Sequence, residues 1–392
     1  MVAALCGTAS LALVPGAVAD SIRGNQQWVL DMMGVSAAWP QTEGAGVTVA
    51  VIDSGVNPDV SDLTGSVSAG PDFSGVGTRP SDPNWGMHGT WMASLIAGHG
   101  HDGGASGVIG VAPQARILSI RVIPDRTDPH YSAYTREQEA TIQRSLADGI
   151  DYAVRHGAKV ISMSIGYSAA SATVKAALLN ANARGVVVIA SAGNSGGPSD
   201  AGAGGMAPDS FPAEYPGVIS VAAVSSSGAV AGFSSDNLSV QLAAPGVRVP
   251  AQGRDGQYWL VSGTSPACAL VAGAAALIKS RYPGLAPDLV VSALITTSSD
   301  RPAKGYDNQE GFGIVDAAAA LAKAGQLAGH RPAATSVPLA FRFGGGPSAV
   351  PPAPVRPRGS GQLILSALLA LASLVLIGAA GTRLALLRRR PR

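Results

Sequence analysis

Five short runs of apolar residues, rich in Val, Ile and Ala, recur along the first part of the chain and are separated by longer stretches of mixed polarity. Each run is almost continuously apolar, which is typical of strands covered on both faces of a parallel sheet. The pattern therefore predicts strands over residues 46–53, 116–123, 158–165, 185–193 and 217–224.

The segments between these runs carry helical signals. Helices are expected over residues 89–98, 137–157 and 171–185, and the last two end at Gly157 and Gly185. Glycine at such a position takes the left-handed conformation that closes a helix. Alternation of strand and helix predicts one α/β domain over residues 20–330, with a mainly parallel sheet covered by helices on both faces.

An apolar segment, residues 1–19, precedes this domain and ends in Ala17-Val18-Ala19. Small residues in this pattern are typical of a signal-peptidase site, so we predict a signal peptide over 1–19. The alternative is a buried N-terminal strand or helix. A basic start to the segment is lacking, which suggests that translation begins further upstream.

The other end of the chain has three parts. Residues 331–360 contain seven prolines and predict a semi-rigid stalk. Residues 361–382 carry no charge and, at about 1.5 Å per residue, reach across the roughly 30 Å of a membrane core. Five arginines follow in residues 383–392 and predict a cytoplasmic tail, with the domain outside the cell membrane on a single-pass anchor. The alternative for 361–382 is a buried core helix.

The formal net charge of +2 conceals an uneven distribution of charge. Residues 331–392 hold nine arginines and no acidic residue, which leaves 18 basic and 25 acidic residues in the first 330. A folded part that is this acidic argues against nucleic acid as a partner.

Four polar residues lie where an α/β sheet presents its ligand sites. Asp53 ends the first predicted strand, Asn194 follows the fourth, and His88 and Ser265 open helical stretches. Taken singly, each residue has an ordinary interpretation as a turn former or a helix cap. Their combination and their order along the chain carry the functional argument.

Sequence motifs around these residues resemble the subtilisin-like serine peptidases over residues 27–322. The motifs are "VAVIDSGV", "HGT", "SMSIG", "SAGNSG", "FPAEYPGVISVAAV", "AAPGVRV", "SGTSPACALVAG" and "GFGIVDAAAAL". The resemblance implies a three-layer subtilisin-like fold and a serine endopeptidase that acts on protein or peptide substrates. It also implies that Ser265 is the nucleophile, His88 the general base and Asp53 the residue that orients His88.

Further roles follow from the same resemblance. The side-chain amide of Asn194 is expected to form the oxyanion hole with the backbone N–H of Ser265. Ser164, Ile165 and Gly166 are expected to bind the substrate backbone as an added strand. No catalytic metal or cofactor is expected, and a structural calcium ion is left open. His99 and His101, in "GHGHDGG", lack acidic neighbours at ligand spacing and are interpreted as part of a mobile loop.

Several positions depart from the family pattern. Pro266 follows the candidate nucleophile, where it fits the first turn of a helix. Cys268 is expected to be a small buried side chain, and Tyr167 to narrow the cleft where a second glycine is common.

The predicted stalk, anchor and basic tail resemble the mycosins, membrane-anchored peptidases of type VII secretion. About 28 residues separate Ala19 from the first strand, too few for a folded pro-domain. The resemblance implies a type VII secretion complex as a partner. The alternatives are a non-catalytic scaffold component of such a complex and a general surface-anchored peptidase.

Overall fold

The computed structural model describes residues 12–13, 19–134, 139–197 and 206–329. The predicted stalk, membrane segment and basic tail lie outside these residues, as does Cys6. Within the described part of the chain, no helix is long and apolar enough to cross a membrane.

A seven-stranded sheet forms the centre of the domain, and every pair of neighbouring strands in it is parallel. The five predicted strands are confirmed, with ends that differ by a few residues. Two more strands, β3 (Val67–Asp72) and β10 (Val240–Pro245), extend the sheet at its edges. In spatial order the strands are β10 (Val240–Pro245), β9 (Val218–Val224), β8 (Val187–Ser191), β7 (Val160–Met163), β2 (Thr48–Asp53), β6 (Arg116–Arg121) and β3 (Val67–Asp72).

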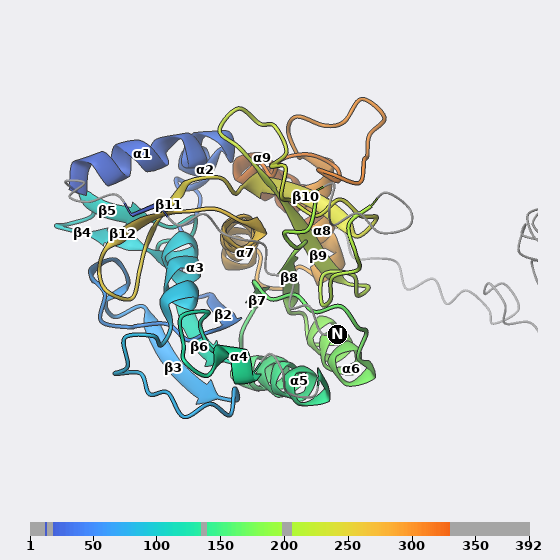
Figure 1. The fold of residues 1–392 in the computed structure, drawn as a ribbon. Coiled ribbons are helices and arrows are strands. Elements are labelled where there is room, and N and C mark those ends of the chain that lie inside the picture. Colours follow the sequence, from blue (N-terminus) through green and yellow to red (C-terminus); the bar gives the residue numbers. More distant parts are fainter. Residues whose placement is uncertain (1–11, 14–18, 135–138, 198–205, 330–392) are drawn as a thin grey trace, which may run out of the picture. The chain divides into compact units, whose positions relative to one another are not determined.

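Helices cover both faces of the sheet, so the predicted three layers are confirmed (Figure 1). Alternate side chains of β2 lie in different apolar clusters, one on each face of the sheet. Val49 and Val51 lie in the apolar cluster of α3 (Met87–Ala97) and α7 (Thr264–Arg281), whereas Ala50 and Ile52 lie in that of α5 (Glu139–Arg155) and α6 (Ala172–Ala183). On the outside of α7 pack α8 (Pro287–Thr296) and α9 (Ala317–Ala328), while α2 (Val35–Ala38) contacts α9 and α1 (Ala19–Met32) contacts α2.

Helix α7 is the central helix of the domain. Its residues from Thr264 to Lys279 are all buried, which explains its richness in Ala and other small residues. A helix that is apolar on every side is surrounded by protein on every side. Its N-terminus, which carries Ser265, is therefore held rigidly.

Two smaller antiparallel sheets lie beside the main one. In one, β12 (Tyr258–Val261) pairs with β11 (Val249–Gln252) and with β1 (Ala12–Leu13), which falls within the predicted signal peptide. The other is a hairpin of β4 (His99–His101) and β5 (Ser106–Ile109). The interpretation of this segment as a loop was wrong, because its Gly-rich sequence hides the strand pattern.

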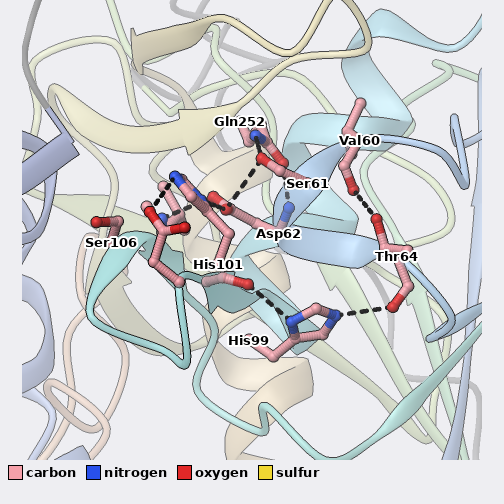
Figure 2. A network of polar contacts seen from close by, with 12 residues as sticks. Val60, Ser61, Asp62, Thr64, His99, His101, Ser106 and Gln252 are labelled. Atoms are coloured by element: carbon pink, nitrogen blue, oxygen red, sulfur yellow. Dashed lines mark hydrogen bonds and ion pairs between the residues drawn. The ribbon is translucent and has the colours of Figure 1, made fainter.

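A buried carboxylate organises the polar contacts of this hairpin (Figure 2). Asp62, in the short helix η1 (Ser61–Leu63), has no exposed surface. It accepts hydrogen bonds from the Val108 N–H at 2.7 Å and the Tyr258 hydroxyl at 3.1 Å, and it contacts His101 Nδ1 at 2.7 Å. One side chain thus joins η1, the β4–β5 hairpin and β12.

Helix α1 is fastened to the same hairpin. Arg23 donates from Nε to the Gly107 carbonyl at 3.1 Å. The Gln26 amide pairs with the backbone of Ile109, donating at 2.7 Å and accepting at 3.0 Å. These contacts make the N-terminal helix part of the domain.

Candidate active site

The predicted residues Asp53 and His88 lie in direct contact. Asp53 is the last residue of β2, is 1% exposed, and accepts a hydrogen bond from the Ser54 N–H at 2.7 Å. His88 Nδ1 lies 2.8 Å and 3.0 Å from the two carboxylate oxygens of Asp53. An ionised carboxylate only accepts, so this contact places the proton on Nδ1 and leaves Nε2 as a base.

Close backbone packing brings α3 to the end of β2. The Gly89 N–H donates to the Ser54 hydroxyl at 3.1 Å. A Cβ atom at Gly89 would lie 2.1 Å from the Gly55 carbonyl oxygen, so only glycine fits at this position. The "HGT" motif therefore lets the first turn of α3 rest on the turn that follows Asp53.

The N-terminus of α3 is capped by a distant residue, Asp125. The N-cap residue, Gly86, offers no side chain. The buried Asp125 carboxylate instead accepts the N–H groups of Met87 at 2.8 Å and His88 at 2.9 Å. Burial raises the pKa of Asp125, and the two backbone donors oppose that shift. This aspartate holds the backbone of the candidate base.

Charge around His88 favours its protonated form. Burial by itself lowers the pKa of the imidazole, but the charge of Asp53, their hydrogen bond and the charge of Asp125 outweigh it. Arg126 acts in the opposite direction. The net result is a raised pKa, which suits a base that must hold a proton during a reaction.

Ser265 is the second residue of α7 and is 8% exposed. Gly263 is the N-cap, so the Ser265 hydroxyl is not needed as a cap. Helix α7 packs against α3, which carries His88. Among the hydrogen bonds of the described residues, none joins the Ser265 hydroxyl to His88. Such contacts often tighten only when substrate binds.

The amide of Asn194 has a fixed orientation. Its oxygen accepts the Thr264 N–H at 2.8 Å and the Thr264 hydroxyl at 3.0 Å, which turns the NH₂ group away from Thr264. A Cβ atom at Gly263 would lie 3.4 Å from Asn194 Nδ2 and 3.7 Å from the Ser265 backbone nitrogen. Glycine at position 263 therefore leaves space beside Asn194 and the Ser265 backbone nitrogen, the two groups that the resemblance predicts as donors of an oxyanion hole.

The predicted substrate-binding segment lies beside Ser265. The Ser164 hydroxyl donates to the Ser265 carbonyl at 3.2 Å. The Ile165 side chain is buried in the core, so it offers only its backbone to a ligand. Within the described part of the chain, no backbone hydrogen bond involves Ser164, Ile165 or Gly166. Their peptide groups are available to an added strand.

Two departures from the family pattern have simple structural explanations. Pro266 lies in the first turn of α7, where its missing N–H costs no intrahelical bond. Cys268 is fully buried, as expected, and burial raises the pKa of its thiol to about 11. Among the residues that the structure describes, no group of three or more His, Cys, Asp or Glu side chains could hold a metal ion.

Asp125 and Thr264 are the polar residues of this site that the sequence did not reveal. Asp125 comes from the loop after β6, which carries no recognisable pattern. Thr264 lies within the "SGTSPACALVAG" motif, so the resemblance included this residue. Its hydrogen bond to Asn194 was not predicted from the sequence.

Comparison with known proteins identifies the relatives of this chain. The model of the Subtilase family matches residues 44–313. Fervidolysin of Fervidobacterium pennivorans is 34% identical over 322 residues, covering 76% of this chain but only 44% of that protein. Mycosin-1 of Mycobacterium tuberculosis is 34% identical over 334 residues, covering 75% of this chain and 72% of mycosin-1.

A solved structure shows the same fold. MycP1 from Mycobacterium smegmatis superimposes with a TM-score of 0.65 and 31% identity, covering 82% of this chain and 89% of MycP1. The family model covers well over half of the sequence, and the mycosins are among its structural relatives. The chain belongs to the Subtilase family of serine endopeptidases and is related to the mycosins of type VII secretion.

Proposed function

We propose that this protein is a membrane-anchored extracytoplasmic serine endopeptidase in which Asp53, His88 and Ser265 form the catalytic triad. The observation that carries the proposal is the contact of His88 Nδ1 with the buried Asp53 carboxylate at 2.8 Å. This contact leaves Nε2 of His88, whose pKa is raised, free to act as a base.

The reaction proceeds in two halves. The Ser265 oxygen attacks the scissile carbonyl carbon while His88 Nε2 accepts the hydroxyl proton. Asn194 Nδ2 and the Ser265 N–H donate to the oxyanion, which also gains from the dipole of α7. His88 then protonates the departing amine, and an acyl-enzyme remains. Water, deprotonated by His88, releases the acid and restores Ser265.

The second part of the proposal concerns the location of this activity at a membrane. We propose a signal peptide over 1–19, a stalk over 331–360, an anchor over 361–382 and a cytoplasmic tail over 383–392. The support is the uncharged run with its trailing arginines. Association with a type VII secretion complex rests on the similarity to mycosin-1 and to MycP1. A scaffold role in such a complex is compatible with catalysis.

A fluorophosphonate probe tests the chemistry, because it phosphonylates only an activated serine. The full-length protein should be labelled, with the adduct on Ser265 by mass spectrometry. The Ser265→Ala variant should fold normally, remain unlabelled and hydrolyse no peptide. Absence of labelling in a folded wild-type protein, or hydrolysis by Ser265→Ala, would sink the proposal and favour the scaffold function.

The membrane proposal has its own test. Full-length protein should stay with membranes after alkaline extraction, whereas a chain ending at residue 360 should be released. Full-length protein in the soluble fraction would contradict the anchor.

A further inference from the structure

A buried arginine, Arg121, is the last residue of β6, and its side chain has no part in the proposed chemistry. In the parallel pairing of β2 with β6 it lies opposite Asp53. Its side chain is 1% exposed. Arginine is rarely buried to this degree, and a buried ion pair often adds less stability than an apolar residue of similar size. Packing alone therefore does not explain an arginine at this position beside the candidate triad.

The guanidinium of Arg121 joins three segments of the chain. Nη1 donates to Asp72 Oδ2, at the end of β3, at 2.7 Å. Nη1 also donates to the Thr78 carbonyl at 3.2 Å, and Nη2 donates to the Thr78 hydroxyl at 2.7 Å. Nη2 reaches Asp128 Oδ2, in the loop after β6, at 3.2 Å, and the Thr78 hydroxyl donates to the same oxygen at 2.7 Å. These four residues thus form one network, the Arg121 network.

The Arg121 network is linked to the backbone of His88 through Asp125. The N–H of Asp128 donates to the Asp125 carbonyl at 2.9 Å, so fixing Asp128 also fixes the turn that begins at Asp125. At the N-terminus of α3, the Asp125 carboxylate accepts the His88 N–H at 2.9 Å. The guanidinium is therefore connected to the candidate base by a short chain of hydrogen bonds.

Arg121 also contacts the segment that leads into α3. Its Cζ atom lies 6.0 Å from the centre of the Trp85 ring, within the range of a cation–π contact. Trp85 immediately precedes Gly86, the N-cap of α3. Its ring covers Gly55, where a Cβ atom would lie 2.5 Å from Trp85 Cζ2. Trp85 thus contacts both Arg121 and the turn that follows Asp53.

One donor of the Arg121 side chain is not satisfied. Within the described part of the chain, its buried Nε has no hydrogen-bond partner. A buried donor without a partner reduces stability. An apolar residue would avoid this loss but could not hold Thr78 and Asp128 in fixed positions. The arrangement therefore favours a fixed geometry at the N-terminus of α3 over the highest stability.

We propose that Arg121 is a positioning residue for catalysis. Its planar fork of donors fixes the Asp125 turn and the Trp85 ring. These two set the first turn of α3, which holds the His88 imidazole where it can act on Ser265. The inference rests on the proposed peptidase function and adds a residue that acts only through others. A change at Arg121 should therefore lower the reactivity of Ser265 and not only the stability of the fold.

The test compares fluorophosphonate labelling of Ser265 in the full-length wild type and in Arg121→Lys, which keeps the charge but loses the fork. With both proteins folded and well below their unfolding temperatures, the second-order rate constant should fall at least about tenfold, because small displacements of catalytic groups are costly. The acidic limb of the rate–pH profile should move to lower pH, since a displaced Asp125 raises the pKa of His88 less. An unchanged rate constant, or a limb that stays in place or moves to higher pH, would overturn the inference.

Two controls and a second variant complete the test. Arg116→Lys, at the exposed first position of the same strand, should be labelled at the wild-type rate. If Arg121→Lys does not fold, Thr78→Val decides, because it removes only the hydroxyl between Arg121 and Asp128. It should lower the rate constant by about threefold or more, with Thr296→Val, exposed on α8, as its control. An unchanged rate in Thr78→Val would overturn the inference alone, whereas a folded wild type that is never labelled would refute the proposed peptidase.

Discussion

Among the described residues, three histidines contact a buried aspartate through Nδ1; His130, beside Asp128, is largely exposed, whereas His88 and His101 have nearly the same geometry. His88 lies 2.8 Å from Asp53, and His101 lies 2.7 Å from Asp62. The aspartates are 1% and 0% exposed, and the histidines 31% and 29%. The contact alone therefore does not distinguish a catalytic pair from a structural one.

The difference lies in what surrounds each pair. Nε2 of His101 faces another carboxylate, Asp102 Oδ2, at 3.6 Å. Asp62 also accepts hydrogen bonds from Val108 and Tyr258, so it joins elements of the fold. His88 instead lies in the first turn of α3, which packs against α7, the helix that carries Ser265 as its second residue. Whether such a His–Asp pair is catalytic or structural therefore depends on the residue that the second imidazole nitrogen, Nε2, can reach.

The largest expected difference between the two pairs concerns catalysis. Asp53→Asn should lower kcat by about 10⁴-fold, the loss typical of this change in a Ser-His-Asp triad, because the amide no longer enforces the Nδ1–H tautomer. Asp62→Asn should leave kcat within a few fold. Steady-state kinetics on both variants measures this, and equal losses would erase the distinction.

Asn194 offers the next test, since we propose that its side-chain amide binds the oxyanion in the reaction that the Asp53–His88 pair assists. Asn194→Ala should lower kcat by about 10²–10³-fold, the magnitude known for an oxyanion-hole asparagine in subtilisin, a member of the same family. KM should change little. The control is Asn180→Ala, on the surface of α6. A large rise in KM with normal kcat would instead indicate a substrate-binding role.

For the free energy of unfolding we expect the opposite order from that for kcat, with the larger loss in the Asp62 variant. Asp62→Asn should reduce the free energy of unfolding by about 1–3 kcal/mol, because the neutral amide leaves buried donors poorly matched. Thermal and urea unfolding compare it with Asp53→Asn, for which we expect a smaller loss. A more stable Asp62→Asn protein would show that the network around η1 is not structural.

The smallest expected effect concerns Asp125. Its negative charge raises the pKa of His88, so Asp125→Asn should lower that pKa. Because His88 must be neutral to act as a base, the acidic limb of the kcat/KM profile should move to lower pH. Rates above the limb should fall by no more than about tenfold, since one of two backbone hydrogen bonds is lost.

A control variant tests whether the shift of the pH profile requires loss of a charge close to His88 or follows from loss of any negative charge. Asp288→Asn, on the exposed first turn of α8, should leave the profile in place. A shift of the limb to higher pH in Asp125→Asn would contradict the electrostatic role of Asp125.

Sequence patterns predicted the parts of the molecule that depend on local or repeated signals. Near-continuous apolar runs located the central strands, and the strand ends located Asp53 and Asn194. Strand β3 was missed because it is largely exposed and contains Gly70 and Pro71. The β4–β5 hairpin was missed for a similar reason.

Contacts between distant segments could not be predicted in the same way. The carboxylate of Asp125 binds a residue 37 positions earlier, and Asp62 binds one 46 positions later. Nothing in the local sequence of either aspartate indicates its partner.

The central claim is that the Asp53–His88 pair, and not the Asp62–His101 pair, activates Ser265. The most direct measurement is the rate at which a fluorophosphonate labels Ser265 in the wild type, His88→Ala and His101→Ala, each verified as folded by circular dichroism. We predict a loss of about 10²–10⁴-fold for His88→Ala, the contribution typical of a general base, and a change of less than about threefold for His101→Ala. Normal labelling of His88→Ala, or an equal loss in both variants, would contradict the account.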